Sequence, residues 1–136
     1  MFDHFLDAQR DSFDQAQKEL RAGQKRSHWI WYIFPQLAAL GRSSTAQRFG
    51  FAGLEEARAY VRHPVLGQRL RSCVALANAI ENSTAHQIFG SPDDLKFRSC
   101  LTLFWLATNE PLFRDGLDKF YGGELDPLTV DLVAPK

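Results

Sequence analysis

The sequence has little cysteine, almost no methionine and no long apolar run. Its 136 residues include two cysteines and one methionine. Its longest apolar run, residues 29–34, is far shorter than the roughly 20 residues of a transmembrane helix. The acidic N-terminus does not resemble a signal peptide. We therefore expect a cytoplasmic protein without a membrane span, in which Cys73 and Cys100 are reduced and buried.

Metal-binding patterns and a large net charge are also missing. The four histidines are scattered and form no ligand pattern with the cysteines, so we predict no metal site and no cofactor. The total charge is zero, but residues 1–72 carry eleven Lys and Arg against seven Asp and Glu, and residues 73–136 carry five against nine. The positive half could attract a phosphate-bearing small molecule, whereas a nucleic-acid partner is not expected.

What is present is apolar spacing typical of helices. It predicts an all-α protein, one multihelical domain over residues 1–136 with about six to eight helices. Ser12 followed by Gln15 could break the first helix. The expected helices span residues 3–22, 28–34, 54–62, 64–82, 92–109 and 111–121. A short turn capped by Ser83 should close at Gly90, and a last short helix should follow Asp126.

Residues 28–34 are the least certain element, because Ile, Trp, Tyr and Phe favour a strand. A buried strand needs a partner for its backbone groups, and no second strand is evident. We therefore predict a short helix, capped by Ser27 and ended by Pro35. If the segment is a strand instead, its partner would belong to another subunit.

The stretch KRSHWIWYIFPQ, residues 25–36, is the main candidate site. On a helix its polar and aromatic side chains would share one face, and Glu19 lies shortly before it. Lys25 suits a phosphate, Trp29 could stack on a planar ring, and His28 or Glu19 could move a proton. The candidate catalytic residues are Glu19 and His28, and the candidate ligand-binding residues here are Lys25, Trp29, Tyr32 and Gln36. Equally, the aromatics could be core residues with one hydrogen-bond partner each.

A second polar pair, Lys96 and Ser99, lies one helical turn apart, opposite an apolar stripe. The pair could belong to a ligand site. It could also be two exposed side chains, because this spacing is common on any helix.

Several segments together resemble the bacterial family catalogued as domain of unknown function 1810, whose members often carry the label calpastatin. They are ELRAGQKRSHWIWYIFPQ, HPVLGQRL, IFGSPDDLKFRSCLTLF and FYGG with Asp126 and Thr129. The likeness covers about residues 3–133. A compact, aromatic, non-repeating chain does not fit calpastatin, which is a long disordered inhibitor.

The resemblance implies a small helical protein without an established activity, and it adds Ser43 to the candidate ligand-binding residues. Polar residues of the family pattern include Glu19, Lys25, His28, Gln36, Ser43, Lys96, Ser99 and Thr102. This chain has Cys100 where the family usually has a second serine, which argues against a two-serine catalytic site.

Two function classes stay open. The first is a cleft for a small ligand, in an enzyme or a binding protein. One version is a hydrolase or N-glycosidase acting on a nucleotide-like or ADP-ribose-like molecule, with Glu19 as base and Lys25, Lys96 or Ser43 on the phosphate. The alternative is a non-catalytic homodimer that uses the aromatic segment as its interface.

Overall fold

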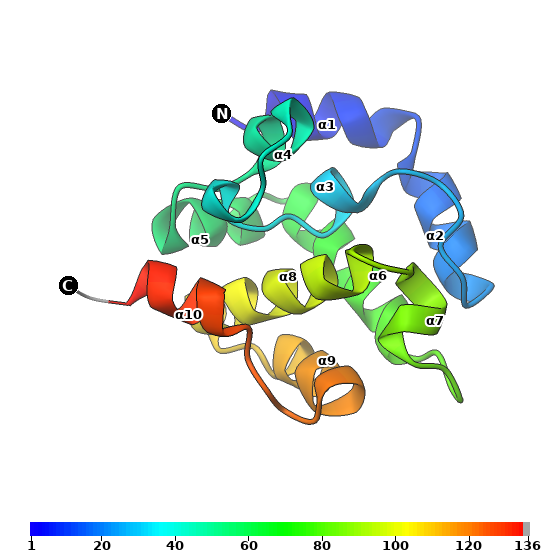
Figure 1. Ribbon diagram of the computed structural model, residues 1–136. Helices are drawn as coiled ribbons and strands as arrows, with labels where there is room; N and C mark the ends of the chain where they lie inside the picture. Colours follow the sequence, from blue (N-terminus) through cyan, green and yellow to red (C-terminus); the bar gives the residue numbers. More distant parts are fainter. Residues whose placement is uncertain (135–136) are drawn as a thin grey trace.

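The computed structural model describes residues 1–134, which form ten α-helices and one short 3-10 helix (Figure 1). The helices are α1 (Asp3–Arg10), α2 (Phe13–Arg21), α3 (Ile30–Ile33), α4 (Ser44–Phe49), α5 (Leu54–Arg62), α6 (Leu66–Asn78), α7 (Ala85–Phe89), α8 (Asp93–Thr108), α9 (Pro111–Tyr121) and α10 (Pro127–Val133). The all-α prediction is confirmed, and the predicted count of six to eight helices is too low.

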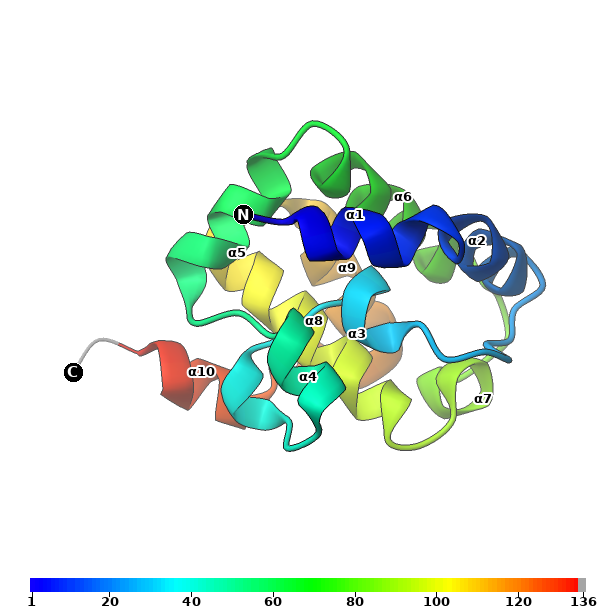
Figure 2. The same ribbon diagram turned by 90° about the horizontal axis from the view of Figure 1, so that it is seen from above.

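The longest helix, α8, is the centre of the fold. It runs through the middle of the molecule, with α5, α7, α9 and α10 packed around it (Figures 1 and 2). Phe97, Leu101 and Phe104 on α8 are completely buried. The segment from α3 to α4 crosses over α8 on the side away from α9 (Figure 1). Helices far apart in sequence, from α3 to α10, therefore meet along α8.

Aromatic rings supply much of the core. Phe5, Phe51 and Tyr60 lie with ring centroids 4.9 to 5.6 Å apart, which brings together α1, the segment between α4 and α5, and the last turn of α5. Phe34 and Phe89 both contact Phe97, at 4.7 and 4.6 Å. Tilted and edge-to-face pairs of this kind add stabilisation beyond the area they bury.

The missing helices have local explanations. Residues 3–22 form two helices, because the chain turns at Asp11 and Ser12. The expected capping box is absent: the Ser12 hydroxyl donates to the Ala8 carbonyl at 2.6 Å instead. Helix α4 and the 3-10 helix Ala38–Leu40 follow Pro35 in a stretch where no helix was expected. Gly50 permits this arrangement, since a Cβ there would lie 2.3 Å from the Ala38 Cα atom.

Start and stop signals predicted most other boundaries. Pro111 and Pro127 occupy first turns, the Asp126 carboxylate caps α10, and Gly122 ends α9 in the left-handed conformation. Two caps differ from expectation. Thr84, not Ser83, forms a capping box with Gln87 at α7.

The other difference is at α6, which begins at Leu66 rather than at Pro64. There, Nδ1 of His63 accepts from the backbone N–H groups of Val65 and Leu66, both at 3.2 Å.

The segment 28–34 is helical, but for less of its length than predicted. Helix α3 contains only residues 30–33, and Trp29 occupies its N-cap position. Lys25, Ser27 and His28 precede it in an irregular loop, so Ser27 is not the cap. The helical face expected to join Lys25, His28, Trp29 and Tyr32 does not form.

Both cysteines are completely buried and free. Burial raises the pKa of the Cys73 thiol to about 12 and that of Cys100 well above its usual range. Among residues 1–134, no helix combines the length and apolar character needed to cross a bilayer. In the same range, no three His, Cys, Asp or Glu side chains gather as metal ligands.

Candidate functional site

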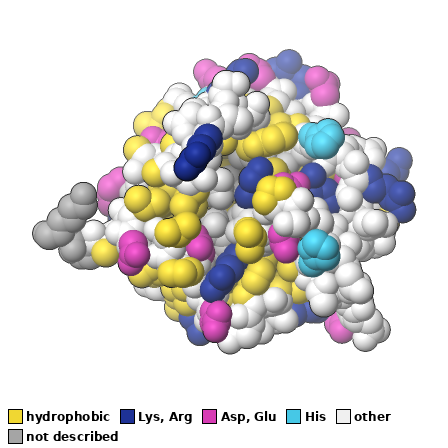
Figure 3. All heavy atoms as spheres, in the orientation of Figure 1, with side chains coloured by type: hydrophobic (Ala, Val, Ile, Leu, Met, Phe, Trp, Pro, Cys, Tyr) yellow, Lys and Arg dark blue, Asp and Glu magenta, His cyan; other side chains and the backbone are white. Residues whose placement is uncertain are grey.

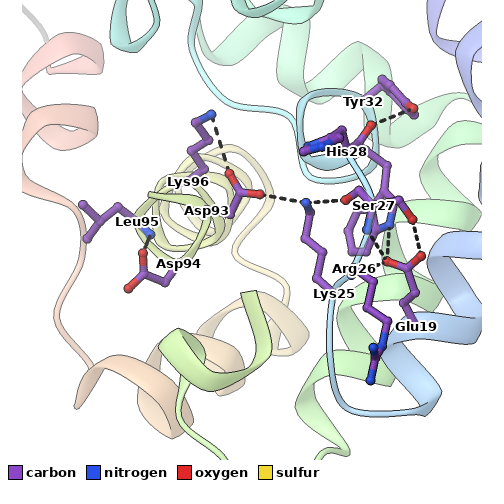
Figure 4. Close-up of polar contacts among 11 residues, drawn as sticks. Glu19, Lys25, Arg26, Ser27, His28, Tyr32, Asp93, Asp94, Leu95 and Lys96 are labelled. Atoms are coloured by element: carbon purple, nitrogen blue, oxygen red, sulfur yellow. Dashed lines mark hydrogen bonds and ion pairs between the residues drawn. The ribbon is translucent and has the colours of Figure 1, made fainter. Parts of the chain in front are cut away.

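The carboxylate of Glu19 organises the loop that precedes α3. It accepts hydrogen bonds from the backbone N–H groups of Arg26 and Ser27, at 2.6 and 2.9 Å, and from the indole Nε1 of Trp29 at 3.0 Å (Figure 4). The Ser27 hydroxyl and the Gln15 amide also donate to it. We call these five residues the Glu19 cluster. Three of these donors bind Oε1 and two bind Oε2.

This hydrogen bonding determines the charge of Glu19. The residue is only 4% exposed, and burial by itself would raise its pKa. The donors outweigh that effect, first the Ser27 hydroxyl and then the Arg26 N–H and Gln15 amide, and lower the pKa from 4.5 to about 2. Such a carboxylate is a weak base. Its geometry is that of a structural anchor for residues 26–29.

Lys25 connects this loop to α8. Its side chain is only 6% exposed, and Nζ lies 2.8 Å from Oδ2 of Asp93 while also donating to the Ser27 carbonyl (Figure 4). The ammonium also lies 5.1 Å from the ring centroid of Trp29. Asp93 is shared, because Nζ of Lys96 lies 3.7 Å from its other oxygen. The first turn of α8 thus carries one carboxylate between two lysines.

His28 and Tyr32 lie at the outer side of this loop. His28 is exposed, and the Tyr32 hydroxyl donates to its backbone carbonyl at 3.3 Å. The Tyr32 ring packs against Phe49 at 5.2 Å, whereas Trp29 is 1% exposed. The aromatic segment is therefore mostly part of the protein's own core.

The remaining predicted residues meet elsewhere, in a cavity of about 410 Å³ beside α8. Segments 36–46, 92–99 and 126–128 line it, and this space is called the α8 cavity below. Its lining contains all four of the predicted residues Gln36, Ser43, Lys96 and Ser99. Glu19, Lys25, His28, Trp29 and Tyr32 do not line it. The structure therefore separates the candidate residues into two groups on either side of the first turns of α8.

Two polar side chains in the α8 cavity have no partner within residues 1–134. Neither the Gln36 amide nor the Arg42 guanidinium hydrogen-bonds to another described residue. Within residues 1–134, the one side-chain atom that is both fully buried and unbonded is Oδ1 of Asn78. The unbonded amide of Gln36 is therefore accessible to solvent. Lys96 has only the distant Asp93 contact and the Trp31 ring, 5.3 Å from its Nζ.

Other cavity residues are held in place. Ser43 accepts from the Ala46 N–H at 3.0 Å and so caps α4. Arg98 donates to the carbonyls of Glu124 and Leu125, at 3.0 and 2.8 Å. Ser99 donates toward Oδ2 of Asp126 at 3.0 Å.

The cavity also has apolar walls. Leu95 and Leu128 are 57% and 63% exposed, unusual for leucine, and both line it together with Leu40 and Pro92. Figure 3 shows hydrophobic side chains interspersed with Lys and Arg on this face of the molecule.

Sequence reasoning missed Arg42, Arg98 and Asp126 as site residues. The sequence held one indication for Asp126, because it belongs to the closing segment that resembles the family, but its position as a helix cap explained its presence there. For Arg42 the sequence held no indication of a site role beyond its proximity to Ser43.

A larger hollow of about 710 Å³ lies between Met1, the start of α5 and the end of α10. Its charged side chains are Glu55, Glu56 and Arg58. Arg58 pairs with Glu55 and donates to the Ala107 carbonyl at 2.9 Å, so the guanidinium in this hollow is already engaged. It offers a weaker candidate site than the α8 cavity.

Fold and site together define a small helical protein with a polar, partly apolar-walled cavity beside its central helix. The family model described as "Protein of unknown function (DUF1810)" matches residues 1–133, so the chain belongs to the DUF1810 family. Among curated proteins, none is detectably similar.

The crystal structure of the conserved hypothetical protein Rv1873 from Mycobacterium tuberculosis is closely similar. It is 46% identical, with a TM-score of 0.97, over 99% of this chain and 97% of that one.

Proposed function

We propose that the protein binds a small phosphate-bearing molecule in the α8 cavity. The observation that carries this proposal is the convergence of Gln36, Arg42 and Lys96, three polar side chains without strong partners, on one cavity of about 410 Å³. That volume lies within the range of small-molecule sites, which are commonly apolar with a few convergent polar groups.

Charge favours an anionic ligand. Three cations, Arg42, Lys96 and Arg98, line the cavity against one carboxylate, Asp126. Arg98 is already bound to backbone carbonyls, so Arg42 and Lys96 are the side chains available for a phosphate, with the Gln36 amide as a neutral donor. A guanidinium and an ammonium together bind a phosphate more strongly than they bind an uncharged ligand.

The apolar walls favour a ligand that is more than an inorganic ion. Leu95 and Leu128 line the cavity, and each is more than half exposed to solvent. A nucleotide-like molecule would cover these leucines with its base while its phosphate reaches the cations. We therefore propose a nucleotide-like ligand.

We propose binding and not catalysis. A hydrolytic role for Glu19 would need a carboxylate that can take a proton near neutral pH, and its pKa of about 2 and five hydrogen bonds favour a structural role. The homodimer alternative has no support from the aromatic segment, since Trp29, Ile30, Ile33 and Phe34 are at most 2% exposed.

Calorimetric titration tests the proposal with AMP, ADP-ribose, adenosine and inorganic phosphate. We expect AMP or ADP-ribose to bind, and adenosine to bind at least ~10-fold more weakly because it lacks the phosphate. Lys96→Met should weaken phosphate-dependent binding by ~10-fold, while Lys18→Met, at an exposed site on α2, should leave it unchanged. Failure of every phosphate compound to bind the folded protein would overturn the proposal.

A further inference from the structure

Asp126 differs from the other cavity residues because one of its oxygens is tightly held and the other is free. Oδ2 accepts from the Ser99 hydroxyl at 3.0 Å, from the Thr129 hydroxyl at 2.6 Å and from the Thr129 N–H at 3.2 Å. Oδ1 accepts nothing from residues 1–134 and is not fully buried. The carboxylate lines the α8 cavity.

The backbone around Asp126 is fixed as well. Its N–H donates to Oγ1 of Thr102 at 2.9 Å, and that hydroxyl in turn donates to the Arg98 carbonyl at 2.8 Å. Thr102 and Thr129 are completely buried. The hydroxyls of Ser99 and Thr129 thus hold the carboxylate, and the hydroxyl of Thr102 holds the backbone of the same residue, which is more than capping a seven-residue helix requires.

The free oxygen is an acceptor in a cavity whose other free groups are donors. Oδ1 is charged and therefore prefers hydroxyl or N–H partners. Lys96 and Asp126 line the same cavity. A ligand bound there can therefore present an anionic group to the ammonium and a hydrogen-bond donor to Oδ1.

We infer that Asp126 recognises the hydroxyl groups of a ribose phosphate and so makes the α8 cavity selective for ribonucleotide-like ligands. This inference rests on the proposed phosphate-binding function. In a 5′-ribonucleotide, one five-membered ring carries the vicinal hydroxyls directly and the phosphate through C5′, so a single ligand offers both the anion and the hydrogen-bond donors. The base then lies toward Leu95 and Leu128.

The test compares AMP with 2′,3′-dideoxyadenosine monophosphate, which keeps the base and the phosphate and lacks both hydroxyls. We expect the unmodified protein to bind AMP ~10-fold or more tightly, as for hydrogen bonds to a charged acceptor. Asp126→Asn should reduce this ratio to about threefold or less, because its amide is uncharged. It should barely change binding of the dideoxy compound.

The chain offers matched controls. Asn is also a good helix cap, so Asp126→Asn should preserve α10, and Asp126→Ser keeps a capping hydroxyl while removing the free oxygen. Asp131→Asn, at an exposed position of the same helix, makes the same charge change outside the cavity and should keep the full ratio. Circular dichroism verifies that each variant is folded.

The outcomes separate the two proposals. Equal binding of AMP and the dideoxy compound by the unmodified protein would overturn the role of Asp126 and leave phosphate binding standing. A ratio that persists in both Asp126→Asn and Asp126→Ser would do the same. Failure of both compounds to bind would overturn the proposed function and, with it, this inference.

Discussion

The Glu19 cluster and the α8 cavity contain similar side chains, yet they differ in how fully these are hydrogen-bonded. In the Glu19 cluster, one carboxylate takes five donors and is 4% exposed. In the cavity, the Gln36 amide and one oxygen of Asp126 have no partner within residues 1–134. A polar group that is buried and satisfied stabilises the fold, whereas one that is open and unsatisfied can bind a ligand.

The two regions meet at the first turn of α8. Asp93 pairs with Lys25 of the buried loop and lies 3.7 Å from Lys96 of the cavity. The loop thus fixes the position of the helix that supplies Lys96 and Ser99. Substitutions on the two sides should therefore separate effects on stability from effects on binding.

Glu19→Ala should destabilise the protein most. It leaves the Trp29 indole and two backbone N–H groups without an acceptor in a buried place, which we expect to cost ~3–5 kcal/mol. Urea denaturation at pH 7 measures the loss. The exposed Glu81→Ala should cost ~0.5 kcal/mol or less, and equal losses for both would show that the cluster is not structurally important.

The stability of the unmodified protein should fall in acid. The pKa of Glu19 is about 2 in the folded protein and near 4.5 when unfolded. Its contribution is therefore fully present above about pH 4.5 and is lost as the pH falls toward 2. The size is roughly 3 kcal/mol. The unmodified protein and Glu19→Gln should differ in denaturation midpoint at pH 5.5, and this difference should shrink at pH 2.5. A difference of equal size at both pH values would contradict the lowered pKa of Glu19.

Lys25→Met should have an intermediate effect. It removes a buried cation from Asp93 and a donor from the Ser27 carbonyl. We expect a loss of ~2 kcal/mol rather than more, because Lys96 still partly neutralises Asp93. Thermal unfolding compares it with Lys18→Met, an exposed lysine of α2. A neutral result would mean that the loop is held by Glu19 alone.

Arg42→Gln should change stability least, by ~0.5 kcal/mol or less, because the side chain is exposed and its guanidinium makes no hydrogen bond or ion pair within residues 1–134. Its affinity for AMP should nevertheless fall by ~10-fold. Arg62→Gln, an exposed arginine of α5, serves as the matched control. If Arg42→Gln lost stability but kept affinity, the contrast between the two regions would not hold.

The helices could be predicted where local signals dominate. Pro111, Gly122 and Asp126 determine their helix ends through fixed φ, left-handed conformation and capping, which depend on a few neighbouring residues. Helix α4 could not be predicted, because its position after Pro35 depends on Gly50 packing against Ala38. The prediction of one helical face over residues 25–32 was wrong, because the backbone N–H groups of Arg26 and Ser27 donate to the Glu19 carboxylate instead of to helix carbonyls.

The sequence by itself determined a helical protein with an aromatic core, two buried thiols and a small set of polar candidate residues. Only the tertiary structure decided which of these residues are used by the fold and which are available to a ligand. The reason is physical: a residue's type sets which hydrogen bonds it can make, but partners distant in sequence, such as Glu19 with Trp29 or Ser99 with Asp126, decide whether those bonds are already made.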